Sequence, residues 1–140
     1  MVIPSNETFD GTWPFVPHFT RASGFQQHYV DEGPRGAETI LCLHGEPTWG
    51  YLYRKMIAPL SETFRVVVPD HMGFGKSETP QDRVYTLQSH VENLERFVEA
   101  LDLRDITLVC QDWGGPIAGA FTLRNPECVK RLFMMNTVLG

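Results

Sequence analysis

The chain has 140 residues, of which 42% are hydrophobic and 21% charged, a composition that favours one packed globular domain and excludes a disordered chain. Its 17 acidic residues outnumber 12 Lys and Arg and give a net charge of −5, so nucleic acid is not an expected partner. No stretch approaches the roughly 18 apolar residues of a membrane-spanning helix, and a membrane partner is likewise not expected.

The first 13 residues, MVIPSNETFDGTW, lack the basic and apolar regions of a secretory signal. The chain contains three cysteines, and two of them, Cys42 and Cys110, fall inside apolar runs typical of strands. We interpret these two and Cys128 as free thiols in a reducing compartment, and not as a disulfide framework or metal ligands. The expectation is a cytoplasmic protein without metal or cofactor.

Five runs rich in apolar and β-branched residues predict strands. In chain order they are FQQHYV (25–30), TILCL (39–43), FRVVV (64–68), ITLVC (106–110) and VKRLFMM (129–135). Residues 1–20 are expected to form an irregular arm followed by a first edge strand, because prolines interrupt them at positions 4, 14 and 17.

Apolar residues at helical spacing predict three helices. They cover residues 49–60, residues 86–103 with Thr86 as N-cap, and a run that follows Gly115 and ends at Arg124. In the long helix the expected core stripe consists of Leu87, Val91, Leu94, Val98 and Leu101. Strands that alternate with helices indicate an α/β fold with a mostly parallel sheet and flanking helices.

The stretch ITLVCQDWGG (106–115) joins a predicted strand to a predicted helix through a turn centred on Asp112. That layout is typical of a nucleophile elbow, in which small residues flank the nucleophile because the strained turn leaves little room. Cys110 and Gly114 occupy the small positions, so Asp112 is a candidate carboxylate nucleophile. The alternative is structural, with Asp112 serving only as the N-cap of the helix.

Two other unusual loops also follow predicted strands. HGEPTW (44–49) comes directly after one buried strand, and PDHMGFGKS (69–77) closes the next. In α/β sheets, ligands bind beyond the carboxyl ends of the strands. We therefore expect these loops and Asp112 to meet in one site.

Together, HGEPTW (44–49), GFGKS (73–77) and QDWGG (111–115) resemble the α/β-hydrolase family, and more closely the haloalkane dehalogenases, in order and spacing. The resemblance covers the chain from about Phe25 onward. It implies an α/β-hydrolase fold and cleavage of carbon–halogen bonds through an aspartyl-ester intermediate. The implied partners are a small halogenated alkane or related electrophile and water, with no cofactor.

The resemblance also implies a role for each matching residue. Asp112 would attack the halogen-bearing carbon, and Trp113 would donate its indole N–H to the leaving halide. The backbone N–H groups of Glu46 and Trp113 would form the oxyanion hole. Because an ionised carboxylate cannot donate a hydrogen bond, the Glu46 side chain is not expected to bind halide; its alternative role is a structural acid that orients the loop.

Other candidate residues are interpreted as structural. GKS (75–77) looks like the end of a phosphate-binding loop, but that motif requires Gly at position 70, where this chain has Asp. His44 and Trp49 are expected to pack. The remaining histidines show no metal spacing and are expected at the surface or in loops; they are His18, His28, His71 and His90.

No histidine follows Asp112, and the only acid that does is Glu127. The family places an acid and a histidine after the nucleophile, and hydrolysis of the ester requires a general base. We therefore expect residues 1–140 to be the N-terminal part of a single α/β-hydrolase domain, truncated before the cap domain and last strands, that reacts once without turnover. The strand at 129–135 would then present an unpaired apolar edge.

Three alternatives remain open. An epoxide hydrolase shares the Asp nucleophile followed by Trp-Gly, and some dehalogenase-like relatives process β-lactones. A non-catalytic, truncated hydrolase-fold module is the alternative outside the enzyme class.

Overall fold

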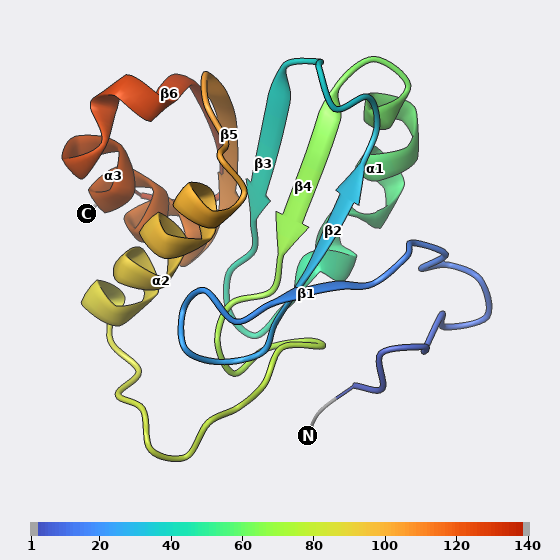
Figure 1. Cartoon of the computed structure of the whole chain (residues 1–140), viewed down its shortest axis with the longest axis horizontal. Coiled ribbons are helices and arrows are strands. Elements are labelled where there is room, and N and C mark those ends of the chain that lie inside the picture. Colours follow the sequence, from blue (N-terminus) through green and yellow to red (C-terminus); the bar gives the residue numbers. More distant parts are fainter. Residues whose placement is uncertain (1–2, 139–140) are drawn as a thin grey trace.

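The computed structural model describes residues 3–138, so the ends of the predicted 1–140 domain, residues 1–2 and 139–140, lie outside the described residues. It contains a sheet of six strands in the order β1-β2-β4-β3-β5-β6 (Figure 1). The strands are β1 (His18–Thr20), β2 (Gln27–Glu32), β3 (Thr39–Leu43), β4 (Arg65–Pro69), β5 (Ile106–Gln111) and β6 (Val129–Met135). The last four are parallel, whereas β2 runs antiparallel to β4 and β1 antiparallel to β2. The predicted mostly parallel sheet is confirmed.

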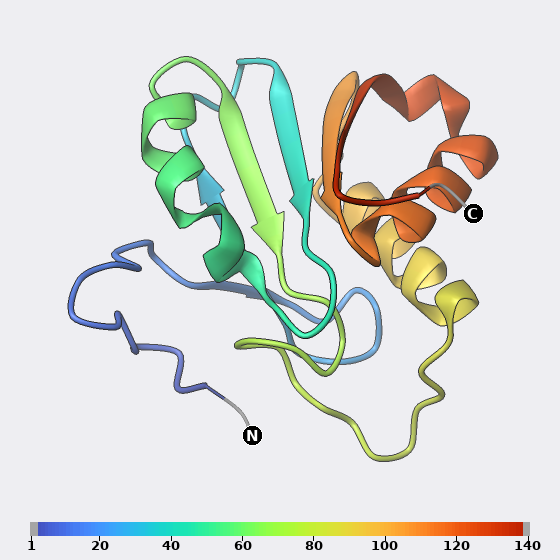
Figure 2. The ribbon, with the colours of Figure 1, turned by 180° about the vertical axis from the view of Figure 1, so that it is seen from behind.

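Helices cover both faces of this sheet, as the two opposite views show (Figures 1 and 2). They are the 3-10 turn η1 (Gly50–Tyr53), α1 (Arg54–Ser61), α2 (Leu87–Ala100), α3 (Gly114–Arg124) and the 3-10 turn η2 (Pro126–Cys128). α1 lies on one face, and α2 and α3 lie together on the other. The predicted helix over 49–60 therefore begins as a 3-10 turn, and the helix predicted to end at 103 ends at Ala100.

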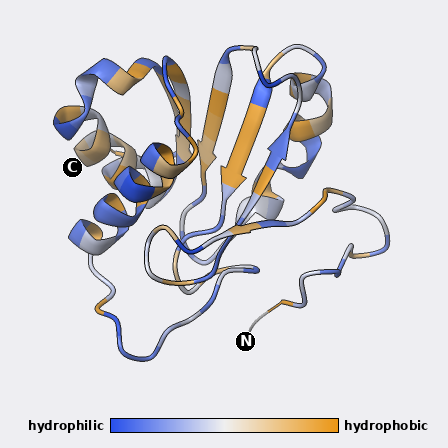
Figure 3. Cartoon of the chain, viewed as in Figure 1, coloured by the Kyte–Doolittle hydropathy of each residue, from blue (hydrophilic) through white to orange (hydrophobic). Residues whose placement is uncertain are grey.

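The alternation of side chains along β3 divides the core into two clusters. Leu41 and Leu43 face α2 and α3, while Ile40 and Cys42 face α1. Because both faces of β3 and β4 are covered, the two strands are apolar along most of their length, and Figure 3 shows them as the hydrophobic centre of the molecule.

The predicted core stripe of α2 is partly wrong. Val91, Leu94 and Val98 are buried, but Leu87 in the first turn is 41% exposed, and the fully buried Phe97 replaces it in the core. Thr86 caps the helix as predicted: its side chain accepts from the backbone N–H of Ser89, whose own hydroxyl accepts from the N–H of Thr86.

β6 forms one edge of the sheet within residues 3–138. Phe133 is 59% exposed and Met134 45% exposed. On the α1 face, a largely apolar groove of about 490 Å³ runs between α1 and β6. Its lining includes Met56, Leu60, Phe64, Val109, Phe133 and Met135. An open, apolar edge of this kind favours self-association.

Candidate active site

The register of the central strands places the predicted loops side by side. Leu43 of β3 pairs with Cys110 of β5, so the two strands end at nearly the same level. The chain leaves β3 at His44 and leaves β5 at Asp112, and these two loops then lie against each other. The loop after β4 joins them through His71, whose backbone N–H donates to Nε2 of His44, so the predicted meeting of the three loops at one edge of the sheet is confirmed.

Asp112 occupies the sharp turn between β5 and α3 with φ of +53°. Aspartate tolerates this left-handed region better than most residues because its short side chain finds local partners. Gly114 is required for the turn, since a Cβ there would lie 2.7 Å from the carbonyl oxygen of Leu43. The strand–turn–helix elbow predicted from residues 106–115 is therefore present.

The carboxylate of Asp112 is held by backbone donors. Its Oδ2 accepts from the N–H of Glu46 at 3.0 Å, and the N–H of Trp113 also contacts it. These two hydrogen bonds, that from Glu46 first, hold the pKa of Asp112 below its ordinary value of 3.8, so the side chain is ionised at neutral pH. The N-cap of α3 is Trp113 with no side-chain cap, so the helix-cap interpretation of Asp112 is wrong.

Glu46 contributes through its backbone alone. Its side chain is exposed and makes no hydrogen bond or ion pair with any residue in the range 3–138, so the alternative of a structural acid that orients the loop is not supported. The close approach of this loop to Asp112 depends on Gly45. A Cβ at that position would collide with Asp112, where it would lie 2.6 Å from Oδ2.

Trp113 stands between two hollows at the elbow. One, of about 250 Å³, lies toward α2 and is named here the α2-side hollow. Its lining residues are Gly45, Glu46, His71, Phe74, Tyr85, Thr86, Leu87, His90, Trp113 and Ile117. The other, of about 410 Å³, is formed by Asp112, Trp113, Pro116 and residues 136–138. The indole is 51% exposed, and its N–H has no partner among the described residues.

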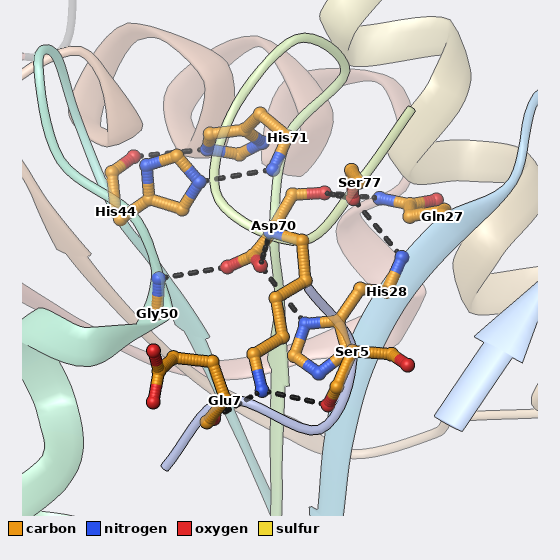
Figure 4. A network of polar contacts seen from close by, with 10 residues as sticks. Ser5, Glu7, Gln27, His28, His44, Gly50, Asp70, His71 and Ser77 are labelled. Carbon is orange, nitrogen blue, oxygen red and sulfur yellow. Dashed lines mark hydrogen bonds and ion pairs between the residues drawn. The ribbon is translucent and has the colours of Figure 1, made fainter. Parts of the chain in front are cut away.

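Behind the elbow, Asp70 is the centre of a buried polar network (Figure 4). Its carboxylate accepts from the N–H groups of Gly50 and Lys76 and pairs with Nδ1 of His28 at 2.9 Å. The network holds the 70–77 loop in place, which agrees with the structural interpretation of GKS (75–77). The Lys76 ammonium donates to the carbonyl oxygens of Ser5 and Glu7, not to an open anion site.

The expectation that the histidines other than His44 lie at the surface or in loops is wrong for His28, which is fully buried in β2, and His71 is 7% exposed in its loop. Asp70 pairs with Nδ1 of His28, whose buried Nε2 has no partner among the described residues, and the carbonyl oxygen of His44 accepts from Nε2 of His71. His71 and His90 both line the α2-side hollow, a position that was not predicted. Trp49 packs against Trp13 and Tyr51, as expected.

Thr137 is another residue of the site that sequence reasoning missed. Its hydroxyl donates to the backbone carbonyl of Asp112 and so ties the segment after β6 to the elbow. The available signal was topological, because β6 is parallel to β5 and ends at the same edge of the sheet. All three cysteines are free. Within residues 3–138 there is no cluster of three or more side chains suited to a metal ion, and no helix has the length and apolarity to cross a membrane.

The chain matches known proteins along most of its length. A haloalkane dehalogenase from Psychrobacter cryohalolentis is 46% identical over 132 residues, which cover 89% of this chain and 44% of the relative. A cis-3-alkyl-4-alkyloxetan-2-one decarboxylase from Shewanella oneidensis is 39% identical over 131 residues, covering 91% of this chain and 41% of the relative. The solved structure of the haloalkane dehalogenase DpaA from Paraglaciecola agarilytica superposes with a TM-score of 0.87 at 43% identity, over 92% of this chain and 46% of the other.

The chain thus spans less than half the length of each of these relatives. The family model described as the alpha/beta hydrolase fold matches residues 38–139, which include β3 to β6 and the elbow. With that match and the elbow geometry, the chain belongs to the α/β-hydrolase fold family and is similar to its haloalkane dehalogenases.

Proposed function

We propose that Asp112 is the nucleophile of a haloalkane dehalogenase-type reaction. The observation that carries the proposal is the carboxylate at the elbow, which two backbone N–H groups keep ionised and which lines the same hollow as the exposed Trp113. A carboxylate in this state needs no base before it attacks carbon. The family membership and the two dehalogenase relatives support the same chemistry.

In the first step, a carboxylate oxygen of Asp112 forms a bond to the halogen-bearing carbon while the carbon–halogen bond breaks. The halide departs with the bonding electron pair, and no proton is transferred. The indole N–H of Trp113 donates to the departing halide, where negative charge develops. The products are free halide and an alkyl ester of Asp112.

In the second step, water attacks the carbonyl carbon of the ester and the N–H groups of Glu46 and Trp113 stabilise the oxyanion. That step requires a general base to take the proton from water. No histidine follows Asp112 in the 140 residues. We therefore expect this chain to release about one halide per molecule and to stop at the ester.

A second candidate function comes from the relatives. Two of them, from Shewanella oneidensis at 39% identity and Xanthomonas campestris at 43% identity, are cis-3-alkyl-4-alkyloxetan-2-one decarboxylases. Their substrates are β-lactones, which are electrophiles without halogen. The same carboxylate and the same backbone donors would serve a reaction that opens this strained ring.

The products distinguish the two functions. The chain is incubated with a primary bromoalkane and, separately, with a cis-3,4-dialkyl-oxetan-2-one, and bromide and carbon dioxide are measured. Dehalogenase-type chemistry predicts the release of bromide in an amount close to that of the protein, and no such release from Asp112→Asn. The matched control is Asp105→Asn, because Asp105 is also a positive-φ aspartate next to β5 but is exposed. Carbon dioxide without bromide would favour the β-lactone reaction, and bromide release that survives in Asp112→Asn would contradict both assignments of the nucleophile.

A further inference from the structure

The loop that brings the Glu46 N–H to Asp112 is held by hydrogen bonds between two buried histidines, His44 and His71 (Figure 4). We propose that His44 and His71 are positioning residues for the oxyanion N–H of Glu46, and that they act only while His44 is neutral. This inference rests on the proposed function for its catalytic consequence. Its structural part, the coupling of His44 to the Glu46 amide, is measured independently.

The contacts of His44 define which ring nitrogen carries the proton. Nδ1 lies 2.8 Å from the carbonyl oxygen of Gly45, which only accepts, so Nδ1 is the donor. Nε2 lies 2.9 Å from the backbone N of His71, which only donates, so Nε2 is the acceptor. The ring therefore has one proton, on Nδ1, and both nitrogens are used.

His71 returns a second hydrogen bond to the same loop. Its Nε2 lies 2.9 Å from the carbonyl oxygen of His44 and donates to it. The two residues thus exchange two hydrogen bonds between the loop after β3 and the loop after β4. Their rings lie 4.2 Å apart, and Phe74 packs its ring against that of His44.

The peptide group between Gly45 and Glu46 links this support to the nucleophile. Its carbonyl oxygen accepts from His44 Nδ1 and from the Thr48 hydroxyl at 3.1 Å, while its N–H donates to Asp112. Hydrogen bonds at both ends of one peptide group polarise and strengthen each other. His44, together with Thr48, therefore orients the Glu46 N–H and strengthens it as a donor.

Protonation of His44 would break the arrangement. A proton on Nε2 would face the backbone N–H of His71, so an acceptor would be replaced by a second donor. Burial lowers the pKa of His44 below its ordinary value of 6.5, and the nearby Asp70 opposes that shift. The other titratable groups that face the pair are His71, with a pKa lowered well below 6.5 by burial, and His90, lowered by burial on α2.

The expected consequence is an acid limb in the alkylation rate. At pH values above the pKa of His44, the neutral ring holds the loop in place. As the pH falls through this pKa, which lies below 6.5, the ring takes up a proton and the loop is released. Asp112 alone would keep the rate flat to below 3.8, where its carboxylate takes up a proton. A tenfold fall per pH unit within that interval would therefore come from the histidine pair.

The matched variants follow from the geometry. In His44→Gln, the amide oxygen replaces Nε2 as an acceptor that does not titrate, so we expect the acid limb to disappear. His44→Ala removes the two hydrogen bonds of the His44 ring, the one to the Gly45 carbonyl oxygen and the one from the His71 N–H. The control is His18→Gln, because His18 belongs to β1 at the opposite edge of the sheet from β6.

Rates of the bromide burst are measured from pH 4 to 8, and the Glu46 amide is followed by NMR over the same range. We expect the Glu46 amide shift to follow the His44 titration in the wild-type chain but not in His44→Gln, and its hydrogen exchange at pH 7 to rise about tenfold in His44→Ala. A Glu46 amide that neither follows His44 nor gains exchange in His44→Ala overturns the inference. Absence of bromide at every pH would overturn the proposed function alone, since the NMR result still decides the coupling.

Discussion

The contact between Gly45 and the elbow offers a sharp perturbation of the site. In Gly45→Ala, the new Cβ would lie 2.6 Å from Oδ2 of Asp112 and 2.8 Å from the backbone N of Trp113, whereas ordinary contacts begin at 3.4 Å. The nearest atom would be the Cβ of Asp112 at 2.4 Å, so the loop must withdraw by about 1.0 Å. This displacement breaks the 3.0 Å hydrogen bond from the Glu46 N–H to Asp112.

A displacement of about 1 Å in a catalytic group lowers rates about 100-fold, which is the loss we expect in the bromide burst of Gly45→Ala. Overpacking of this buried position should also lower the free energy of unfolding by about 1–3 kcal/mol. Both are measured, the first by single-turnover bromide release and the second by urea denaturation. The control is Gly36→Ala, because a Cβ at Gly36 meets nothing within 4 Å. A Gly45→Ala chain with an unchanged burst would refute the argument that this loop and the elbow are in functional contact.

Three further changes test the fold around the site. Thr86→Ala removes the cap of α2 and should lower the free energy of unfolding by about 0.5–2 kcal/mol in urea titrations, with the exposed Thr63→Ala as control. Leu108→Ala leaves a cavity in the core under α2 and α3 and should lower the free energy of unfolding by about 2–5 kcal/mol. Its control is Leu123→Ala, because Leu123 is 85% exposed and its loss should lower the free energy of unfolding by less than about 0.5 kcal/mol. Equal losses in the two variants would contradict the core assignment. Phe133→Ser should reduce concentration-dependent light scattering if the open edge at β6 drives association, and Leu123→Ser should not.

Most of the sheet could be predicted because its signals are local. The runs at 39–43 and 129–135 coincide with β3 and β6. For β3 the reason is burial on both faces, which requires a continuous run of apolar and β-branched residues. The elbow was predictable for a similar reason, because Asp112 and Gly114 meet its steric demands within a few residues. The loops could be assigned to a single site because each follows a predicted parallel strand, and the likeness of three motifs to one family agrees with that assignment.

The features that escaped prediction depend on contacts distant in sequence. His28 is buried because Asp70, 42 positions along the chain, accepts from its ring, and no local pattern contains that pairing. Phe97 lies in the core and Leu87 does not, because the first turn of α2 borders the α2-side hollow, where the core ends. Thr137 contacts the elbow only because β6 pairs beside β5.

The measurement that tests the central claim most directly is the site of the covalent adduct. After reaction with a primary bromoalkane, the chain is weighed intact and then digested with trypsin, which releases residues 105–124 as one peptide. We predict one alkyl group on Asp112, removable by hydroxylamine because it is an ester. Cys110 lies on the same peptide, but burial raises the pKa of its thiol, and a thioether there would resist hydroxylamine. An adduct on Cys110 or Asp105, or bromide release with no adduct on Asp112, would contradict the assignment of Asp112 as the nucleophile.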